Sequence, residues 1–215
     1  MTSRLTMANQ ALALCGANTI ESFDESSNEA GAISRYYDDL VEDTFSADIW
    51  PFASKRLQLE RINDGSGNAV PALTQWKYQF IIPTECLYIH KIFNTPSFNA
   101  RPTGNFDKLE DVILADDPVI YAEYGFYAPE NTWPGHFKAF FIHALAARIA
   151  VELTDDFDLR DRYRQEAYGN PSSNYKGGLY GRSLAAAKRQ RPGQMIAHNP
   201  LATARFTTIY SSGIQ

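Results

Sequence analysis

The chain has 215 residues, of which 44% are hydrophobic and 21% charged, and its formal net charge is -5. This composition is ordinary for a soluble globular protein of one large or two small domains, which can bury a sizeable core without a metal or a disulfide. No apolar run approaches the roughly 18 residues that a membrane span needs.

The N-terminal region predicts a helix and no targeting signal. Its first residues lack the basic and apolar regions of a secretory signal, so we expect none. A helix is predicted from Ser3 to Cys15, and Gly16 supplies the left-handed residue that ends many helices. Cys15 and Cys86 each lie in an apolar pattern, which favours two buried thiols over a disulfide.

The segment from Ser26 to Ala53 is the one around which the chain is organised. Ser26 and Glu29 have the spacing of a capping box, and apolar residues at three- and four-residue steps then predict one long helix up to Trp50. Pro51 ends that helix because it cannot continue the hydrogen-bond ladder. Trp50 and Phe52 flank the boundary, and we expect these large aromatic side chains to anchor one domain onto another.

After Pro51 the hydrophobic period changes from 3.6 to 2, which predicts strands. The predicted strands cover residues 56–60, 76–82, 87–93, 109–114 and 119–124. The last two are predicted to pair as a hairpin around the turn residues Asp116, Asp117 and Pro118.

Helical periodicity returns after Trp133. Residues 137–151 are apolar nearly all round, which predicts a helix buried on most sides. A further helix is predicted from Thr154 to Gly169, an irregular segment over 170–182, and a brief helix over 183–189. From Pro192 the pattern indicates an extended arm.

This order of elements predicts an α+β fold, in which a helical bundle built from the N- and C-terminal segments carries an inserted antiparallel β domain. The predicted parts are a first helical segment (1–50), the β domain (51–132), a second helical segment (133–190) and an extended C-terminal arm (191–215).

No residue pattern predicts a catalytic, cofactor or metal site. His136 and His143 lie about 10 Å apart along a helix, too far to share a metal without other ligands. The aspartates at 155–161 lack the glycine and the final glutamate of a calcium loop, and helix N-terminal charge explains most of them.

Charge is distributed unevenly along the chain. Residues 1–60 hold four basic and ten acidic side chains, whereas residues 160–215 hold nine basic and two acidic ones. Such ends suit a protein that meets copies of itself or an acidic partner. The candidate residues for binding such a partner or a neighbouring copy are Arg182, Lys188, Arg189, Arg191 and Arg205.

Several stretches resemble the tail tubular protein A family of short-tailed phages. They are residues 12–16 (Leu-Ala-Leu-Cys-Gly), 20–27, the corner Trp50-Pro-Phe-Ala53, residues 78–87 and the helix over 140–153 followed by Asp158-Leu-Arg-Asp-Arg-Tyr163. The resemblance spans about residues 5 to 168, and the Trp-Pro-Phe-Ala corner and the Pro-x-x-Cys-Leu step at 83–87 are its most specific parts.

The resemblance implies a structural virion protein at the head–tail junction, made in the host cytoplasm. Such adaptors form a twelve-copy ring that binds the portal protein above and the tail nozzle protein below, while DNA passes through the middle without specific binding. Neither a membrane nor a cofactor is implied.

Two other functions remain open on the residues alone. A tail component acting as a glycan or peptidoglycan hydrolase needs a carboxylate pair, for which Glu123 with Asp116 or Asp117 is the available choice. A nucleic-acid-binding module would use the basic C-terminal tail, although the acidic total charge does not favour binding to free DNA.

Overall fold

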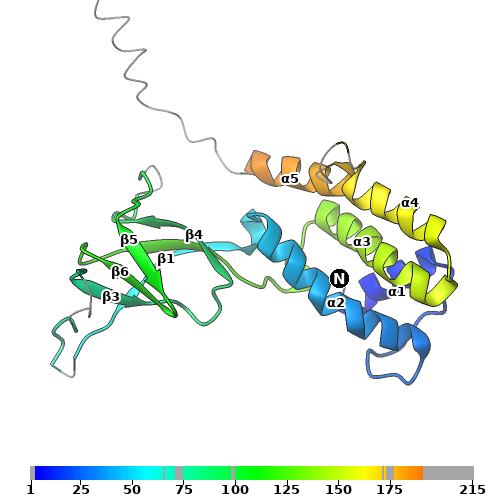
Figure 1. The fold of residues 1–215 in the computed structure, drawn as a ribbon, viewed down its shortest axis with the longest axis horizontal. Helices are drawn as coiled ribbons and strands as arrows, with labels where there is room; N and C mark the ends of the chain where they lie inside the picture. The colour runs from blue at the N-terminus through cyan, green and yellow to red at the C-terminus, as the bar shows by residue number, and fades with distance from the viewer. Residues whose placement is uncertain are drawn as a thin grey trace, which may run out of the picture.

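The structure, a computed structural model, describes residues 3–64, 66–70, 75–97, 100–170, 172 and 177–190. The helices lie at one end of an elongated molecule and the strands at the other (Figure 1). The helices are α1 (Arg4–Leu14), α2 (Asn28–Ala47), α3 (Gly135–Thr154), α4 (Phe157–Tyr168) and α5 (Gly178–Gln190). All strands lie in the sequence between α2 and α3, so the predicted α+β class with an inserted antiparallel β part is confirmed.

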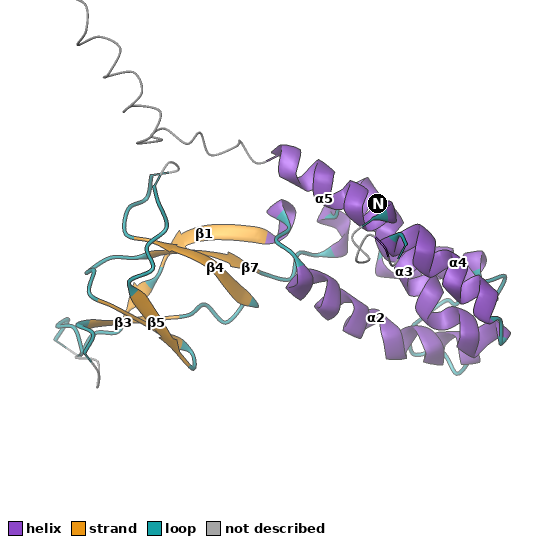
Figure 2. Cartoon of the chain, turned by 45° about the horizontal axis from the view of Figure 1, so that its top comes forward, coloured by secondary structure: helices purple, strands orange, loops and turns teal. Residues whose placement is uncertain are grey.

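The β part consists of two antiparallel sheets (Figure 2). Their strands are β1 (Ser54–Gln58), β2 (Glu60–Arg61), β3 (Tyr78–Ile81), β4 (Tyr88–Phe93), β5 (Phe106–Leu109), β6 (Val112–Ala115) and β7 (Tyr121–Gly125). The sheet orders are β1-β7-β4 and β2-β3-β6-β5. A core shared by both sheets buries Phe80, Ile92, Ile113, Ile120 and Tyr124.

The predicted hairpin around Asp116–Pro118 is wrong. β6 pairs with β5, and the turn between them contains Glu110 at a φ of 50°. β7 instead lies in the other sheet, between β1 and β4. A glutamate with a left-handed backbone is uncommon in a turn, so the sequence gives no signal for this one. The Asp-Asp-Pro segment carries residues typical of turns, but it connects β6 in one sheet to β7 in the other.

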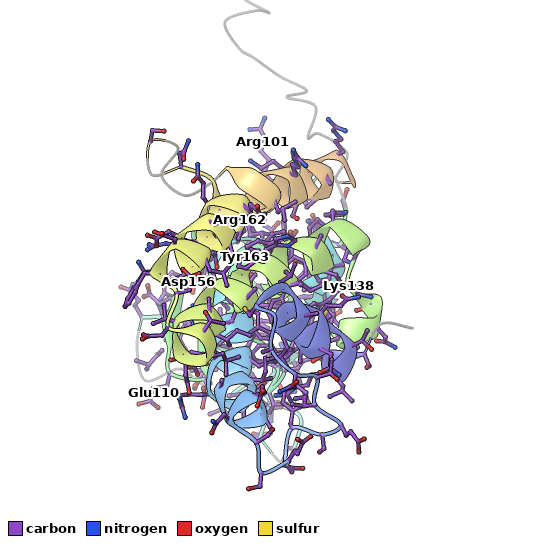
Figure 3. All side chains as sticks on the ribbon, turned by 90° about the vertical axis from the view of Figure 1, so that its right-hand side faces the viewer. Arg101, Glu110, Lys138, Asp156, Arg162 and Tyr163 are labelled. Atoms are coloured by element: carbon purple, nitrogen blue, oxygen red, sulfur yellow. The ribbon has the colours of Figure 1, made fainter. Side chains whose placement is uncertain are left out.

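The helical core forms around α3, which packs against α1, α2, α4 and α5. This explains why its sequence is apolar nearly all round, and the prediction of burial on most sides is confirmed. The hydroxyl of Tyr163 on α4 donates a hydrogen bond of 2.6 Å to the carbonyl oxygen of Leu14 and so joins α4 to the end of α1. Arg162, its neighbour, is exposed (Figure 3).

Both predicted ends of the second helix are corrected. Ser27, not Ser26, is the N-cap of α2, and its hydroxyl accepts from the backbone N–H of Ala30. α2 ends at Ala47, because Asp48 is extended, and Pro51 begins a separate 3-10 turn (Pro51–Ala53). Sequence periodicity places a helix boundary only to within a few residues, and the cap itself decides it.

The prediction that 170–182 is irregular is partly wrong, because α5 begins at Gly178. Gly178 has a φ of 56°, and a Cβ there would lie 2.5 Å from the carbonyl oxygen of Glu166. A glycine is therefore required where α5 starts against the end of α4. The predicted extended arm, 191–215, lies outside the described residues.

Among the helices that the structure describes, none is long and apolar enough to cross a bilayer.

Candidate interaction surfaces

The basic residues predicted to bind a partner are placed in part on α5. Arg182, Lys188 and Arg189 are exposed there, and within the described residues no hydrogen bond or ion pair engages any of the three. We call these three residues the basic stripe of α5. Arg191 and Arg205 lie outside the described residues.

The opposite side of α5 fixes the helix on the bundle. Ser183 is fully buried, and its hydroxyl donates to the carbonyl oxygen of His136 at 2.8 Å. Tyr180 is also buried, and its hydroxyl donates to the carboxylate of Asp48 at the end of α2. Because these contacts set the rotation of the helix, the basic stripe is held facing outward.

A second surface lies between α2 and the segment before α3. It is a groove of about 420 Å³, here called the acidic groove, and its lining residues are Asp38, Val41, Glu42, Tyr127, Ala128, Pro129, Glu130 and Trp133. The indole N–H of Trp133 donates to the carbonyl oxygen of Ala128 at 2.8 Å, which fixes the loop that forms one wall. Tyr127 is 48% exposed and presents an aromatic ring to solvent.

The electrostatics of the acidic groove are dominated by carboxylates. Asp38 pairs with Arg4 at 2.8 Å. Glu42 and Glu130, by contrast, have no ion pair or side-chain hydrogen bond with any residue that the structure describes. Burial raises the pKa of Tyr127, and the negative charges of Glu42 and Asp38 raise it further. The groove thus combines an aromatic wall with unneutralised negative charge.

The two surfaces lie on different sides of the bundle. α3 packs against both α2 and α5 and lies between them (Figures 1 and 3). The protein therefore shows negative charge on its α2 side and positive charge on its α5 side.

The predicted anchor residues both pack into the helical core. Trp50 is 1% exposed, and its ring centroid lies 4.7 Å from that of Phe137 on α3. Phe52, half-buried, lies 4.9 Å from the same ring. Directly after this corner the chain enters β1, and the backbone N–H of Phe126 donates to the carbonyl oxygen of Ala53 at 3.0 Å. The aromatic corner therefore fixes the point where strands leave the bundle.

A third hollow, of about 620 Å³, is formed by α2, α3 and α4 and contains arginines. Its lining residues are Tyr36, Ala144, Ala147, Arg148, Val151, Arg160, Arg164 and Tyr168. Arg148 pairs with Asp43, and Arg160 pairs with Asp161 at 2.7 Å. These pairs neutralise much of the positive charge, so the hollow is a weaker candidate for an anion than its arginine content indicates.

Two of the three carboxylates considered for hydrolysis, Glu123 and Asp116, have structural partners. Glu123 pairs with Arg56 at 2.9 Å across β7 and β1, and Asp116 accepts a hydrogen bond of 3.2 Å from the backbone N–H of Lys77. Within the described part of the chain, no group of three or more His, Cys, Asp or Glu residues is placed to hold a metal ion.

Comparisons with known proteins do not assign the chain. No protein-family model matches the sequence, and no curated protein matches it.

The acidic groove is the surface that sequence reasoning missed. Asp38 and Glu42 lie on one helix, α2, but Glu130 lies 88 positions beyond Glu42 in the sequence. A short-range pattern cannot bring such distant residues together. The four-residue spacing of Asp38 and Glu42, which places both on one side of the helix, was the available signal.

Proposed function

We propose that this protein is a structural head-to-tail adaptor of a short-tailed phage virion, which forms a ring between the portal and the tail nozzle. DNA passes through the ring without specific binding. The observation that carries the proposal is the Trp50–Ala53 corner. In the sequence it is the most specific part of the resemblance to tail tubular protein A, and in the structure its two large aromatic rings pack against Phe137 where the strands leave the bundle.

The distribution of charge supports the same proposal. A ring is built from heterologous interfaces, in which one side of each subunit fits a different side of the next. Here the α2 side is acidic and the α5 side is basic, and α3 lies between them. The hydrolase alternative has less support, because Glu123, which both of its candidate carboxylate pairs need, is paired with Arg56.

Light scattering tests the adaptor role on the purified chain, alone and mixed with the portal protein of the same phage. We expect one complex of ring size with the portal, even if the free chain is smaller. The adaptor role is refuted if folded partners form no complex at micromolar concentrations.

A truncation identifies the portal-binding segment. A chain ending at Gln190 lacks Arg191 and Arg205 and retains every helix described above. We expect it to keep the circular dichroism spectrum of the full chain and to lose portal binding. Replacement of Arg191 and Arg205 by glutamine in the full chain is the matched variant, because it removes the two charges and keeps the segment. Portal binding by the truncated chain at full strength would contradict the assignment of this segment.

A further inference from the structure

We infer that the acidic groove of one copy is the docking site for the basic stripe of α5 on a second copy. The inference deepens the proposed function and rests on it for its setting, but it concerns a contact that the two copies make with each other, without the portal. The chemistry is that of a cationic helix face lying on an aromatic, negatively charged groove.

The groove has the composition of a docking site and not of a solvated acidic surface. Val41, Tyr127, Pro129 and Trp133 give it apolar and aromatic walls. Tyr127 is 48% exposed, so part of its aromatic ring is accessible to solvent. Glu42 and Glu130 contribute negative charge from two separate segments, and neither has an ion pair among the residues described.

The basic stripe of α5 matches this groove. Arg182 and Arg189 lie seven residues apart on one side of the helix, about 10 Å along its axis. The side chain between them, Ala185, is exposed and small, so the helix backbone can approach closely. The aliphatic stems of arginine and lysine cover aromatic rings while their charged ends reach carboxylates, and a guanidinium over an aromatic face gains a cation–π attraction.

The positions of the two surfaces make the contact heterologous. α5 and α2 pack on α3 from different sides, so the stripe and the groove of one copy do not meet across the bundle core (Figure 1). Each copy therefore offers a stripe to one neighbour and a groove to the other. Contacts of this kind close into rings when the rotation between neighbours allows it.

Cross-linking tests the contact directly. A carbodiimide joins a lysine amine to a carboxylate at zero length, so we expect Lys188 to be linked to Glu42 or Glu130. Mixing isotope-labelled and unlabelled chains shows whether the linked peptides come from two copies. Lys188→Arg is the matched control, because it keeps the charge and removes the amine: association should persist and this link should disappear.

Charge reversal tests the energetics by sedimentation velocity at low salt. We expect self-association to weaken at least about tenfold in a groove variant (Glu42→Lys with Glu130→Lys) and in a stripe variant (Lys188→Glu with Arg189→Glu). Mixing the two variants should restore association, because each reversed surface then meets a reversed partner. A control with the same charge change as the groove variant but on the β part, Glu60→Lys with Asp111→Lys, should associate as the original chain does.

The inference is overturned if the chain stays monomeric at every concentration, if the links join residues of one copy, or if reversal has no effect. These outcomes are separate from the adaptor role. A ring-sized complex with the portal that is insensitive to both reversals refutes the docking contact and leaves the adaptor standing. A groove-to-stripe link without any portal complex does the opposite.

Discussion

Replacement of Trp50 by alanine tests whether the aromatic corner stabilises the bundle. The side chain is 1% exposed, and its ring contacts those of Phe137, Tyr180 and Phe52 at centroid distances of 4.7, 5.8 and 6.0 Å. Its indole N–H also donates to the carbonyl oxygen of Thr44 at 2.8 Å. That carbonyl lies in the last turn of α2, where the helix supplies no further donor.

The magnitude follows from these contacts. Removal of a fully buried tryptophan costs about 3–5 kcal/mol through lost burial and the cavity that remains. Trp50→Phe keeps an aromatic ring but leaves the Thr44 carbonyl without its donor, for which about 1–3 kcal/mol is expected. Trp50→Phe loses the hydrogen bond and part of the buried indole, so the difference in cost between the two variants measures the contribution of the ring that phenylalanine keeps.

Urea unfolding followed by far-ultraviolet circular dichroism measures the free energy of unfolding of each variant. Phe157→Ala is the control, because Phe157 is 55% exposed on α4 and its removal should change stability by less than about 1 kcal/mol. The reasoning is refuted if Trp50→Ala costs no more than the control. A cost as large for Trp50→Phe as for Trp50→Ala would show that the aromatic ring kept by phenylalanine contributes no stability.

Two further predictions concern buried polar groups. Tyr163→Phe should lower the free energy of unfolding by about 1 kcal/mol, because it removes the hydrogen bond to Leu14. Tyr37→Phe should lower it by less, because no described residue makes a hydrogen bond with the Tyr37 hydroxyl. Urea unfolding of both variants measures the difference. Burial raises the pKa of the Cys15 thiol from 9.0 to about 11, so the folded state holds this proton more tightly than the unfolded state does. The free energy of unfolding should therefore fall by on the order of 2 kcal/mol as the pH rises from 9 to 11. The free energy of unfolding of Cys15→Ala, measured across that pH range, should decrease less than that of the original chain. An equal decrease with pH in both would show that the Cys15 thiol does not cause it.

Local patterns in the sequence predicted the helices better than the strand pairing. The apolar stripe of α2 and the nearly uniform apolar character of α3 follow from a 3.6-residue period, and burial of each is observed. The pairing of β5 with β6 depends on a tight turn at Glu110, whose residue type gives no turn signal. The start of α5 depends on close approach to Glu166, a contact between segments that composition alone does not show.

The two candidate surfaces also differ in how far the sequence predicts them, because one is local in the sequence and the other combines distant segments. The basic stripe lies within one short segment, so counting charge along the chain found it. The acidic groove combines α2 with a loop that is held by the Trp133 to Ala128 hydrogen bond, so it exists only after the loop has folded against the helix.

The aromatic corner lies between the two helices that carry the charged surfaces. Trp50 contacts Phe137 of α3 and Tyr180 of α5, and the Tyr180 hydroxyl donates to Asp48 at the end of α2. The same small group of side chains thus sets the position of α2, which carries part of the groove, and of α5, which carries the stripe. A change in this cluster is therefore expected to alter the placement of the groove relative to the stripe.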